Sequence, residues 1–504
     1  MNIAFFSFAD IEAVDGRLTS DVASARYRVI QPALQLMRQG HSVKLRKQPV
    51  QPEQDGIDVA VISKSFDGRN ESGVAALKAR GVRVVFDVSD NHFVHPQLGP
   101  HYQALAEMAD AIVVPTTAMA QAVRQHCRRE AVVISDPVEG DRAEPCFRPS
   151  FPQLELLWFG HPTNLDSLDA SLNDLRQLAQ RLPLRLTIVT SPTGELSKAI
   201  GQLNSQPGNF RCRLLPWSTE SMAEHLAAAD LVVLPTLDDP AKAVKSPNRL
   251  IEALWAGRAV VTQPQPAHQE FAEFVFIAPT LSAGIEQALA AREQVESRIL
   301  AGQRHIARHY SPYRIGRDWL SLLAPAQTRP LRLNLGCGDK ILPGYVNVDV
   351  VASRAGQRPD LLCDLHSLHP FDDDSVDEIL SVHVVEHFWR WEVLDILKEW
   401  VRVLKPGAPL ILECPNLIAA CQRLLEDPVE RSATDRRGQE TMWVFYGDPN
   451  WQDPYMVHRW AYTPASLAAL MQEAGLSNIS QQPAQFKLRE PRDMRVVGYK
   501  PANQ

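Results

Sequence analysis

Glycine and an acid stand at the ends of two neighbouring apolar runs in the second half of the chain. Residues 331–335 predict a buried parallel strand, and the Gly-Cys-Gly of residues 336–338 follows it directly. Glycine lets the backbone turn sharply and approach a ligand. A second short strand, 345–349, ends in Asp349, whose carboxylate can accept both hydroxyls of a ribose. We interpret the pair as a nucleoside site, although the glycines alone fit an ordinary strand-to-helix turn equally well.

Two histidines and an acid follow a later strand of the same region. Residues 378–382 predict that strand, and His383, Glu386 and His387 come directly after it. Parallel sheets bind ligands at the carboxyl ends of their strands, so these side chains are expected near the nucleoside. Imidazole titrates near neutral pH, and we favour His387 as the base that deprotonates an acceptor hydroxyl. In the alternative interpretation both histidines are structural and Glu386 is a cap.

An aromatic segment, residues 443–460, comes late in the chain and contains Tyr446, His458 and Arg459. Aromatic faces offer flat apolar contact area, so we expect this segment to cover an acceptor. The same residues also suit a hydrophobic core.

A helix start near residue 246 has the residue types of a phosphate site. Ser246 is a good N-cap, and the amides behind it, beside Lys245 and Arg249, can bind a diphosphate. Glu252, one turn further on, can accept ribose hydroxyls. Alternatively, the charges form a solvated face and Trp217 belongs to the core. The candidate donor-binding residues, all on this helix or at predicted strand ends, are Gly160, His161, Trp217, Lys245, Ser246, Asn248, Arg249 and Glu252.

Polar residues near the start of the chain are candidates for an acceptor. Asp90 and His92 follow the predicted strand 82–86, and either can accept a hydroxyl proton, although a strand-end cap is the alternative. Arg26 and Arg28 are candidates for contact with a phosphate-bearing acceptor.

Strands and helices that alternate along the chain must position these groups. A repeated pattern, at 109–116 and again at 229–236, indicates two similar α/β halves. The proline-containing residues 324–330 predict a linker. We therefore expect Rossmann-like domains at 1–150 and 151–323, and a third at 331–504.

Composition narrows the class of protein. The 504 residues are 45% hydrophobic and 22% charged with net charge −7, which disfavours a nucleic-acid binder. Seven scattered cysteines favour a reducing compartment. There is no basic leader and no apolar run of about 20 residues. We expect a cytoplasmic protein, with peripheral membrane contact left open.

Residues 331–504 strongly resemble the class I S-adenosylmethionine-dependent methyltransferases. The resemblance rests on Asn-Leu-Gly-Cys-Gly at 334–338, Val-Asn-Val-Asp at 346–349, His-Val-Val-Glu-His at 383–387 and Leu-Lys-Pro-Gly at 404–407. Lys340 stands where many relatives have a third glycine. The resemblance implies cofactor contacts to methionine, ribose and adenine from, in turn, Gly336, Cys337 and Gly338, then Asp349, then Asp364 and Leu365.

Residues 1–323 resemble nucleotide-sugar glycosyltransferases with the GT-B fold, on the loops 215–218 and 245–261. The resemblance implies a donor bound to the second half, its ribose held by Glu252, and a last helix near 309–319 that crosses back to the first half. The retaining branch has another glutamate eight positions earlier, where this chain has Val244. That departure leaves donor identity, stereochemistry and activity open.

These expectations combine into a bifunctional enzyme that transfers a sugar from a nucleotide-sugar and O-methylates a glycan or glycolipid, in bacterial surface polysaccharide or glycoconjugate biosynthesis. S-adenosylmethionine is the expected cofactor, and no metal is expected. In one alternative the first 323 residues are a non-catalytic glycan-binding module. In another, the methyltransferase acts on a small metabolite.

Overall fold

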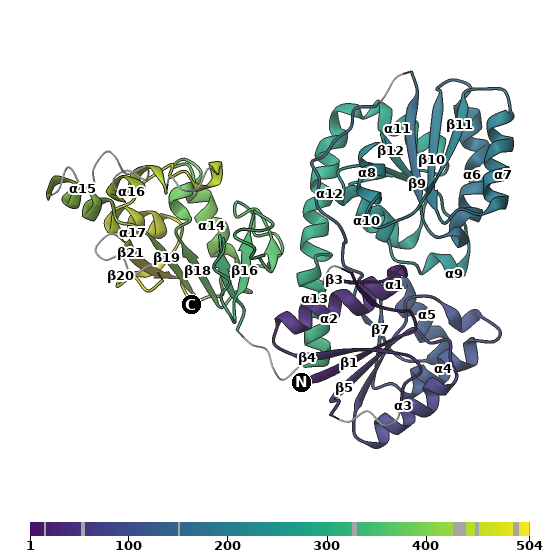
Figure 1. Ribbon diagram of the computed structural model, residues 1–504, viewed down its shortest axis with the longest axis horizontal. Helices are drawn as coiled ribbons and strands as arrows, with labels where there is room; N and C mark the ends of the chain where they lie inside the picture. The colour runs from purple at the N-terminus through teal and green to yellow at the C-terminus, as the bar shows by residue number, and fades with distance from the viewer. Residues whose placement is uncertain are drawn as a thin grey trace. The chain divides into compact units, whose positions relative to one another are not determined.

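The computed structural model describes residues 1–14, 17–51, 56–149, 152–324, 330–426, 440–448, 453–486 and 493–502. It divides into two compact units, Met1–Pro325 and Ala326–Gln504 (Figure 1). The predicted linker, 324–330, falls almost wholly outside the described residues. Within the described ranges, no helix combines the length and apolar composition that a bilayer crossing requires.

The first half of unit 1 is built on a six-stranded parallel sheet. Alternate side chains of its strands enter two separate cores: Ile3 and Phe5 pack on one face, Ala4 and Phe6 on the other. The strands, in sheet order, are β4 (Ser42–Lys47), β1 (Asn2–Ser7), β5 (Val59–Ser63), β6 (Arg83–Asp87), β7 (Ala111–Val114) and β8 (Val132–Val133). The helices are α1 (Ala23–Ala25), η1 (Arg26–Ile30), α2 (Gln31–Arg38), α3 (Arg69–Ala79), η2 (His92–Val94), α4 (Gly99–Met108) and α5 (Thr117–Cys127).

The second half has its own six-stranded parallel sheet, with helices on both faces (Figure 1). The strands, in sheet order, are β11 (Phe210–Pro216), β10 (Leu184–Thr190), β9 (Leu154–Phe159), β12 (Leu231–Leu234), β13 (Ala259–Thr262) and β14 (Phe276–Ile277). The helices are η3 (Pro162–Asn164), α6 (Leu165–Leu178), α7 (Gly194–Ser205), α8 (Met222–Ala227), α9 (Pro240–Ala243), α10 (Asn248–Trp255), η4 (Pro266–Phe271), α11 (Leu281–Ala290), η5 (Arg292–Gln294) and α12 (Val295–His309). The repeated sequence pattern falls on β7 in the first half and on β12 in the second. These strands do not occupy equivalent places, because β7 lies three strands from β1 whereas β12 is next to β9.

The last helix of unit 1, α13 (Pro312–Leu323), crosses back to the first half, where it lies beside α2 (Figure 1). Ile315, Trp319 and Leu323 pack in the core that contains Phe5. Gly316 allows this approach, because a Cβ there would lie 2.4 Å from Gln35 Cβ. Two parallel α/β sheets joined in this way form a GT-B arrangement.

Unit 2 contains a seven-stranded sheet in which two final antiparallel strands extend a parallel set. The last strand of the chain, β21, lies between β19 and β20 and runs antiparallel to both. The strands, in sheet order, are β17 (Leu361–Leu362), β16 (Val346–Asp349), β15 (Arg332–Leu335), β18 (Glu378–Val382), β19 (Pro409–Pro415), β21 (Asp493–Tyr499) and β20 (Ser477–Gln482). The helices are η6 (Val385–His387), α14 (Val393–Val403), α15 (Leu417–Glu426), η7 (Glu440–Met442), α16 (Trp443–Tyr446), η8 (Pro454–Met456) and α17 (Pro464–Glu473).

Local structure departs from expectation in the first half and at α10. A short hairpin, β2 (Glu12–Val14) with β3 (Arg17–Thr19), and the π-helical turn η1 were not predicted. The prediction that Ser246 caps a helix is wrong, because α10 starts two residues later and Pro247 occupies the cap position without a side-chain hydrogen bond. Ser246 instead donates to Asn248 Oδ1 at 2.7 Å.

Candidate functional site

The turn after β15 is held by hydrogen bonds to the neighbouring strand. The amides of Gly336 and Cys337 both donate to Val348 O, at 2.8 and 3.1 Å. Gly336 has φ of 67°, and a Cβ there would lie 2.4 Å from a methyl group of Val384. Only glycine combines this left-handed conformation with so close an approach.

Asp349 ties the end of β16 to the same turn. Its Oδ2 accepts the amide of Gly338 at 2.7 Å, and its Oδ1 accepts the amide of Val351 at 2.9 Å. Each carboxylate oxygen keeps a second lone pair for a ligand hydroxyl. Asn334 links the turn to the next strand through Lys340 O and Asn347 Oδ1, both at 2.9 Å.

A cavity of about 720 Å³ opens beside this turn. That volume lies in the range of small-molecule and cofactor sites. Trp400 supports its wall by donating its indole N–H to Leu365 O at 2.9 Å, while Asp364 pairs with His366. The cavity brings together all six residues expected at the cofactor, namely Gly336, Cys337, Gly338, Asp349, Asp364 and Leu365.

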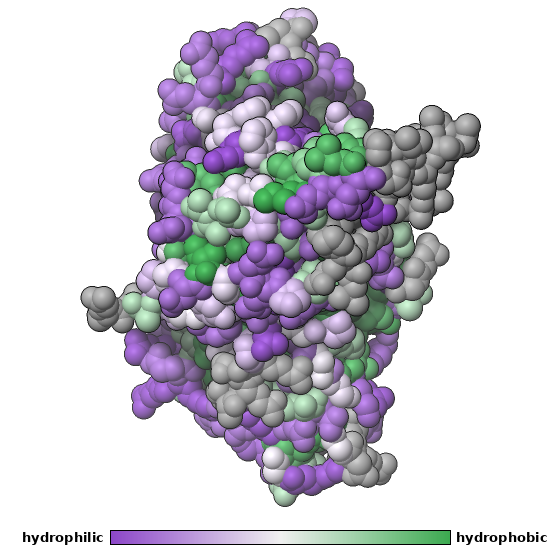
Figure 2. Space-filling view, turned by 90° about the vertical axis from the view of Figure 1, so that its left-hand side faces the viewer, coloured by the Kyte–Doolittle hydropathy of each residue, from purple (hydrophilic) through white to green (hydrophobic). Residues whose placement is uncertain are grey.

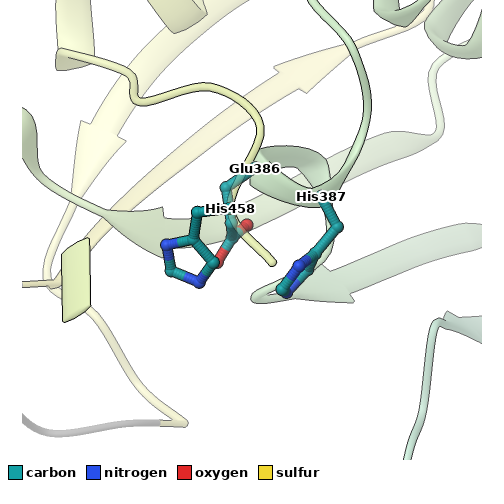
Figure 3. Close-up of side chains that lie close together, drawn as sticks. All are labelled: Glu386, His387 and His458. Carbon is teal, nitrogen blue, oxygen red and sulfur yellow. The ribbon is translucent and has the colours of Figure 1, made fainter. Parts of the chain in front are cut away.

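A second group of chemically active side chains adjoins the cavity. Glu386, His387 and His458 lie close together, although His458 comes 71 positions after His387 in the chain (Figure 3). His383 Nδ1 lies 3.1 Å from Glu386 Oε1, and His383 has a left-handed backbone with φ of 55°. Non-glycine residues in that conformation cluster at functional sites.

Burial and charge determine the protonation of this group. Burial alone raises the pKa of Glu386, but the neighbouring histidines, His383 first, lower it to about 2. Burial lowers the pKa of His387. At neutral pH the group therefore combines an ionised carboxylate with a neutral His387 imidazole.

The far wall of the cavity comes from the aromatic segment. Trp443, Tyr455, Met456, His458 and Arg459 line it. Tyr446 does not line the cavity and is 68% exposed, so its predicted acceptor contact lies, at most, at the rim.

Apolar residues on the face drawn in Figure 2 form small patches among hydrophilic ones.

Two contacts at the cavity were not predicted. Arg354 Nη2 lies 2.9 Å from Asp453 Oδ2, joining the loop after β16 to the aromatic segment, and Phe486 lines the opening. The Arg354–Asp453 partners are 99 positions apart, so no local pattern could have paired them.

The predicted donor site has its own geometry in unit 1. Arg249 Nη1 donates to Phe159 O at 3.2 Å and would lie 3.2 Å from a Cβ at Gly160. Burial lowers the pKa of Arg249 to about 10, a range in which the side chain stays positively charged at neutral pH. His161 is exposed and pairs with Thr163, whereas Asn248 reaches the first half through Asp136 Oδ2 at 2.8 Å.

Residues of the first half contact two of the candidate donor-binding residues, Glu252 and Trp217. Tyr27 donates a hydrogen bond to Glu252, and Arg26 lies over the Trp217 ring, 5.3 Å from its centroid. Arg26 also pairs with Glu139 at 2.9 Å. Burial raises the pKa of Glu252 to about 7. Arg26 and Tyr27, which are consecutive in η1, thus contact the side chains to which a donor nucleotide was expected to bind.

Among the remaining candidates of unit 1, Asp90 and Lys245 make polar contacts, whereas His92 packs against an aromatic ring. Asp90 pairs with Lys64 at 2.5 Å, and the charges of Lys64 and Lys245 lower the pKa of Asp90 against the raising effect of burial. Lys245 lies 3.5 Å from Asn164. His92 packs against Tyr102, with ring centroids 4.9 Å apart, and burial lowers its pKa.

Arg28 does not occupy the expected acceptor position. Its guanidinium is buried and pairs with Asp87 at 2.5 Å and Asp136 at 3.1 Å. It also donates to Ile134 O. The structure thus gives Arg28 a structural contact in place of the expected contact with an acceptor phosphate.

Val244 packs in the core of the first half. It is 6% exposed, and its carbonyl accepts the Thr116 hydroxyl at 2.7 Å. The position at which retaining relatives have a glutamate is therefore an apolar contact between the halves.

Family comparisons agree with both units. The family model described as "Glycosyl transferases group 1" matches residues 153–291, and the one described as "Methyltransferase domain" matches residues 345–412. The chain is a transferase that carries a glycosyltransferase domain and, C-terminal to it, a methyltransferase domain. Its fold is a GT-B arrangement followed by a Rossmann-like methyltransferase domain.

Several solved structures are similar to part of this chain. TarM of S. aureus, in complex with Fondaparinux, alpha-GlcNAc-glycerol and UDP, is 14% identical, with TM-score 0.39 over 53% of this chain and 55% of that chain. Anabaena Alr3699/HepE in complex with UDP is 13% identical, with TM-score 0.46 over 64% of this chain and 100% of that one. An E. coli trehalose-6-phosphate structure with UDP-2-fluoro glucose is 12% identical, with TM-score 0.43 over 64% and 99%. No curated protein matches the chain.

Proposed function

We propose that this chain transfers a sugar from a nucleotide-sugar and methylates a hydroxyl of a glycan or glycolipid with S-adenosylmethionine, in the biosynthesis of a bacterial surface polysaccharide or glycoconjugate. Fusion of two activities that share a glycan raises the local concentration of the intermediate. One observation carries the proposal: a single cavity has a nucleoside-type turn on one side and a group of histidines and aromatic residues on the other.

The two sides have complementary tasks in methyl transfer. The turn and Asp349 would hold the methionine and ribose of the cofactor, and Asp364 with Leu365 would face its adenine. The acceptor hydroxyl lies toward His383 and His387. The bound cofactor would supply an electrophilic methyl group to the hydroxyl oxygen and would leave as a neutral thioether, while the histidine group would accept the hydroxyl proton. The protein's own residues mainly supply alignment and a proton acceptor.

Incubation of the full chain with isotopically labelled S-adenosylmethionine and a panel of glycans and glycolipids tests this function. We expect label in an alkali-stable methyl ether on a sugar. Label found only in proteins, in the lipid part of an acceptor, or in a small metabolite contradicts the proposal.

A second candidate concerns unit 1 alone, as a glycan-binding module without transferase activity. Two observations favour it: Val244 is an apolar core contact, and Tyr27 and Arg26 lie on the expected nucleoside contacts. Mass spectrometry of reactions with a panel of nucleotide-sugars separates the candidates. Release of free nucleoside diphosphate, with or without acceptor, supports transferase activity, while glycan binding without any release supports the module.

A further inference from the structure

Three side chains of unit 2 present their ligand atoms to one another beside the cofactor cavity. One ligand atom each from Glu386, His387 and His458 lies within 4.8 Å of the other two (Figure 3). His458 Nε2 lies 3.9 Å from Glu386 Oε1, and the two imidazole rings meet edge to face with centroids 4.9 Å apart. Ligands of one tetrahedral ion with bonds of about 2.1 Å stand roughly 3.4 Å apart, so small side-chain movements suffice.

The outer nitrogen of each imidazole is held by backbone. His387 Nδ1 lies 3.1 Å from Val457 O, and His458 Nδ1 lies 3.0 Å from Val444 O. A carbonyl can only accept, so each Nδ1 must carry the proton, and each Nε2 of the neutral ring has a lone pair. Metal-binding histidines are oriented by the same kind of second hydrogen bond.

The carboxylate supplies an independent observation. Glu386 is 1% exposed, and neither of its oxygens makes a hydrogen bond with correct geometry among the residues that the structure describes. His383 approaches Oε1 to 3.1 Å as an ion-pair partner only. The Glu386 backbone is fixed, because its carbonyl accepts the amides of Arg459 and Trp460 at 2.8 and 3.2 Å. A buried carboxylate whose close partners are imidazoles alone is stabilised further by a cation.

We propose that Glu386, His387 and His458 bind a divalent transition-metal ion, preferably Zn²⁺, on the acceptor side of the cavity. Two imidazoles and one carboxylate suit zinc, and three protein ligands leave a coordination position for an oxygen of the acceptor. His387 and His458 line the cavity, so this position is open to a bound molecule. This proposal differs from the expectation that the protein binds no metal.

A metal at this point also deepens the proposed function, on which this part of the inference rests. A divalent ion lowers the pKa of a hydroxyl bound to it and fixes that oxygen for an in-line displacement. His387 then acts as a ligand, and the proton of the metal-bound hydroxyl is released to water and not to His387. Binding of the metal itself is independent of any activity.

The test uses the full chain without an affinity tag. The protein is stripped with a chelator, loaded with ZnCl₂, dialysed and measured by inductively coupled plasma mass spectrometry. We expect about one zinc ion per chain. Substitution of Co²⁺ should give the absorption spectrum of a four- or five-coordinate site with nitrogen ligands. A chain that retains no zinc, or cobalt that shows the spectrum of the aqueous ion, overturns the proposal.

Variants locate the ion. Glu386→Gln, His387→Gln and His458→Gln should each weaken zinc affinity by more than the roughly 10–100-fold that loss of a supporting residue costs. His369→Gln is the matched control, because His369 belongs to unit 2 but binds Ser367 O away from the cavity. Zinc retained equally by all four variants overturns the assignment. The cobalt spectrum of the unaltered chain keeps the test decisive if a variant does not fold.

Calorimetry with S-adenosylhomocysteine on the metal-free chain separates this inference from the proposed function. Heat without zinc binding means that the cofactor site stands and the metal site fails. Zinc binding without heat from S-adenosylhomocysteine means that the metal site stands and the cofactor site fails.

Discussion

Tyr27 donates its hydroxyl hydrogen to the carboxylate of Glu252, a residue 225 positions further along the chain. The bond joins the two halves of unit 1 at the group that a nucleotide ribose is expected to use. Arg26, also from the first half, lies over the ring of Trp217 in the second half. A nucleotide-sugar that uses the proposed donor site would therefore displace two side chains of the first half before it binds the second.

Removal of the hydroxyl should favour the nucleotide. We expect Tyr27→Phe to tighten the binding of a nucleoside diphosphate about fivefold, since a typical hydrogen bond contributes about 1 kcal/mol. Titration calorimetry measures the change. Tyr310→Phe is the control, because Tyr310 also donates to a glutamate, Glu270 at 2.8 Å, but away from the predicted donor site. Equal or weaker binding by Tyr27→Phe contradicts the displacement.

The raised pKa of Glu252 makes stability depend on pH. Its ordinary value is 4.5 and burial raises it to about 7, so the folded chain binds the proton more tightly than the unfolded chain. Stability contributed by the protonated form is complete below about 4.5 and is lost as pH rises toward 7. The difference is on the order of 3 kcal/mol. Glu252→Gln should flatten this part of the stability profile in urea unfolding between pH 4.5 and 8. An unchanged slope contradicts the expectation.

The cofactor proposal depends on the charge of Asp349. Asp349→Asn should raise the dissociation constant of S-adenosylhomocysteine at least about tenfold, because hydrogen bonds to charged groups contribute about 1.5–3 kcal/mol. Asp377→Asn is a matched control, since Asp377 Oδ2 also accepts a backbone amide, that of Leu331 at 2.7 Å, but lies outside the cavity. Calorimetry should show normal affinity for Asp377→Asn. Equal losses in both variants argue against a ribose contact.

Two glycines separate backbone conformation from steric contact. Gly336→Ala places a methyl group 2.4 Å from Val384 at φ of 67°, whereas Gly344, at φ of 83°, has open space around it. We expect Gly336→Ala to lower the free energy of unfolding by about 1–3 kcal/mol more than Gly344→Ala does, because overpacking adds to the shared conformational cost. Urea unfolding of both variants measures the difference. Equal costs mean that Val384 yields without penalty.

The buried charge of Arg28 should matter to stability and leave acceptor binding unaffected. Arg28→Met leaves Asp87 and Asp136 without their partner and should cost about 3–5 kcal/mol of folding free energy. Arg124→Met, which removes an exposed ion pair with Glu130, should cost less than about 1 kcal/mol. Thermal and urea unfolding compare the two. A stable Arg28→Met chain that binds glycans poorly restores the acceptor assignment.

Prediction from sequence reached the parts of the molecule that depend on short stretches of chain. The turn at Gly336 and the acid at Asp349 are encoded within 14 residues, and the cavity contains both. His458 was expected near an acceptor, but its approach to Glu386 depends on folding of the whole unit. The Tyr27–Glu252 bond depends on how two halves close, which no local pattern specifies. Ser246 is not the cap, because α10 starts at Asn248 and Pro247 occupies the cap position.

The return of α13 to the first half determines where the chain can be divided. Trp319 fills a core position beside Phe5, with ring centroids 5.7 Å apart, although it follows the whole second half in sequence. A truncated chain that stops before Pro312 would leave a cavity of the size of a tryptophan side chain and would expose apolar core residues of the first half to water. A chain that continues through Ala324 retains α13 and keeps this core covered. Separate expression of the glycosyltransferase domain should therefore place its terminus between that residue and Pro330.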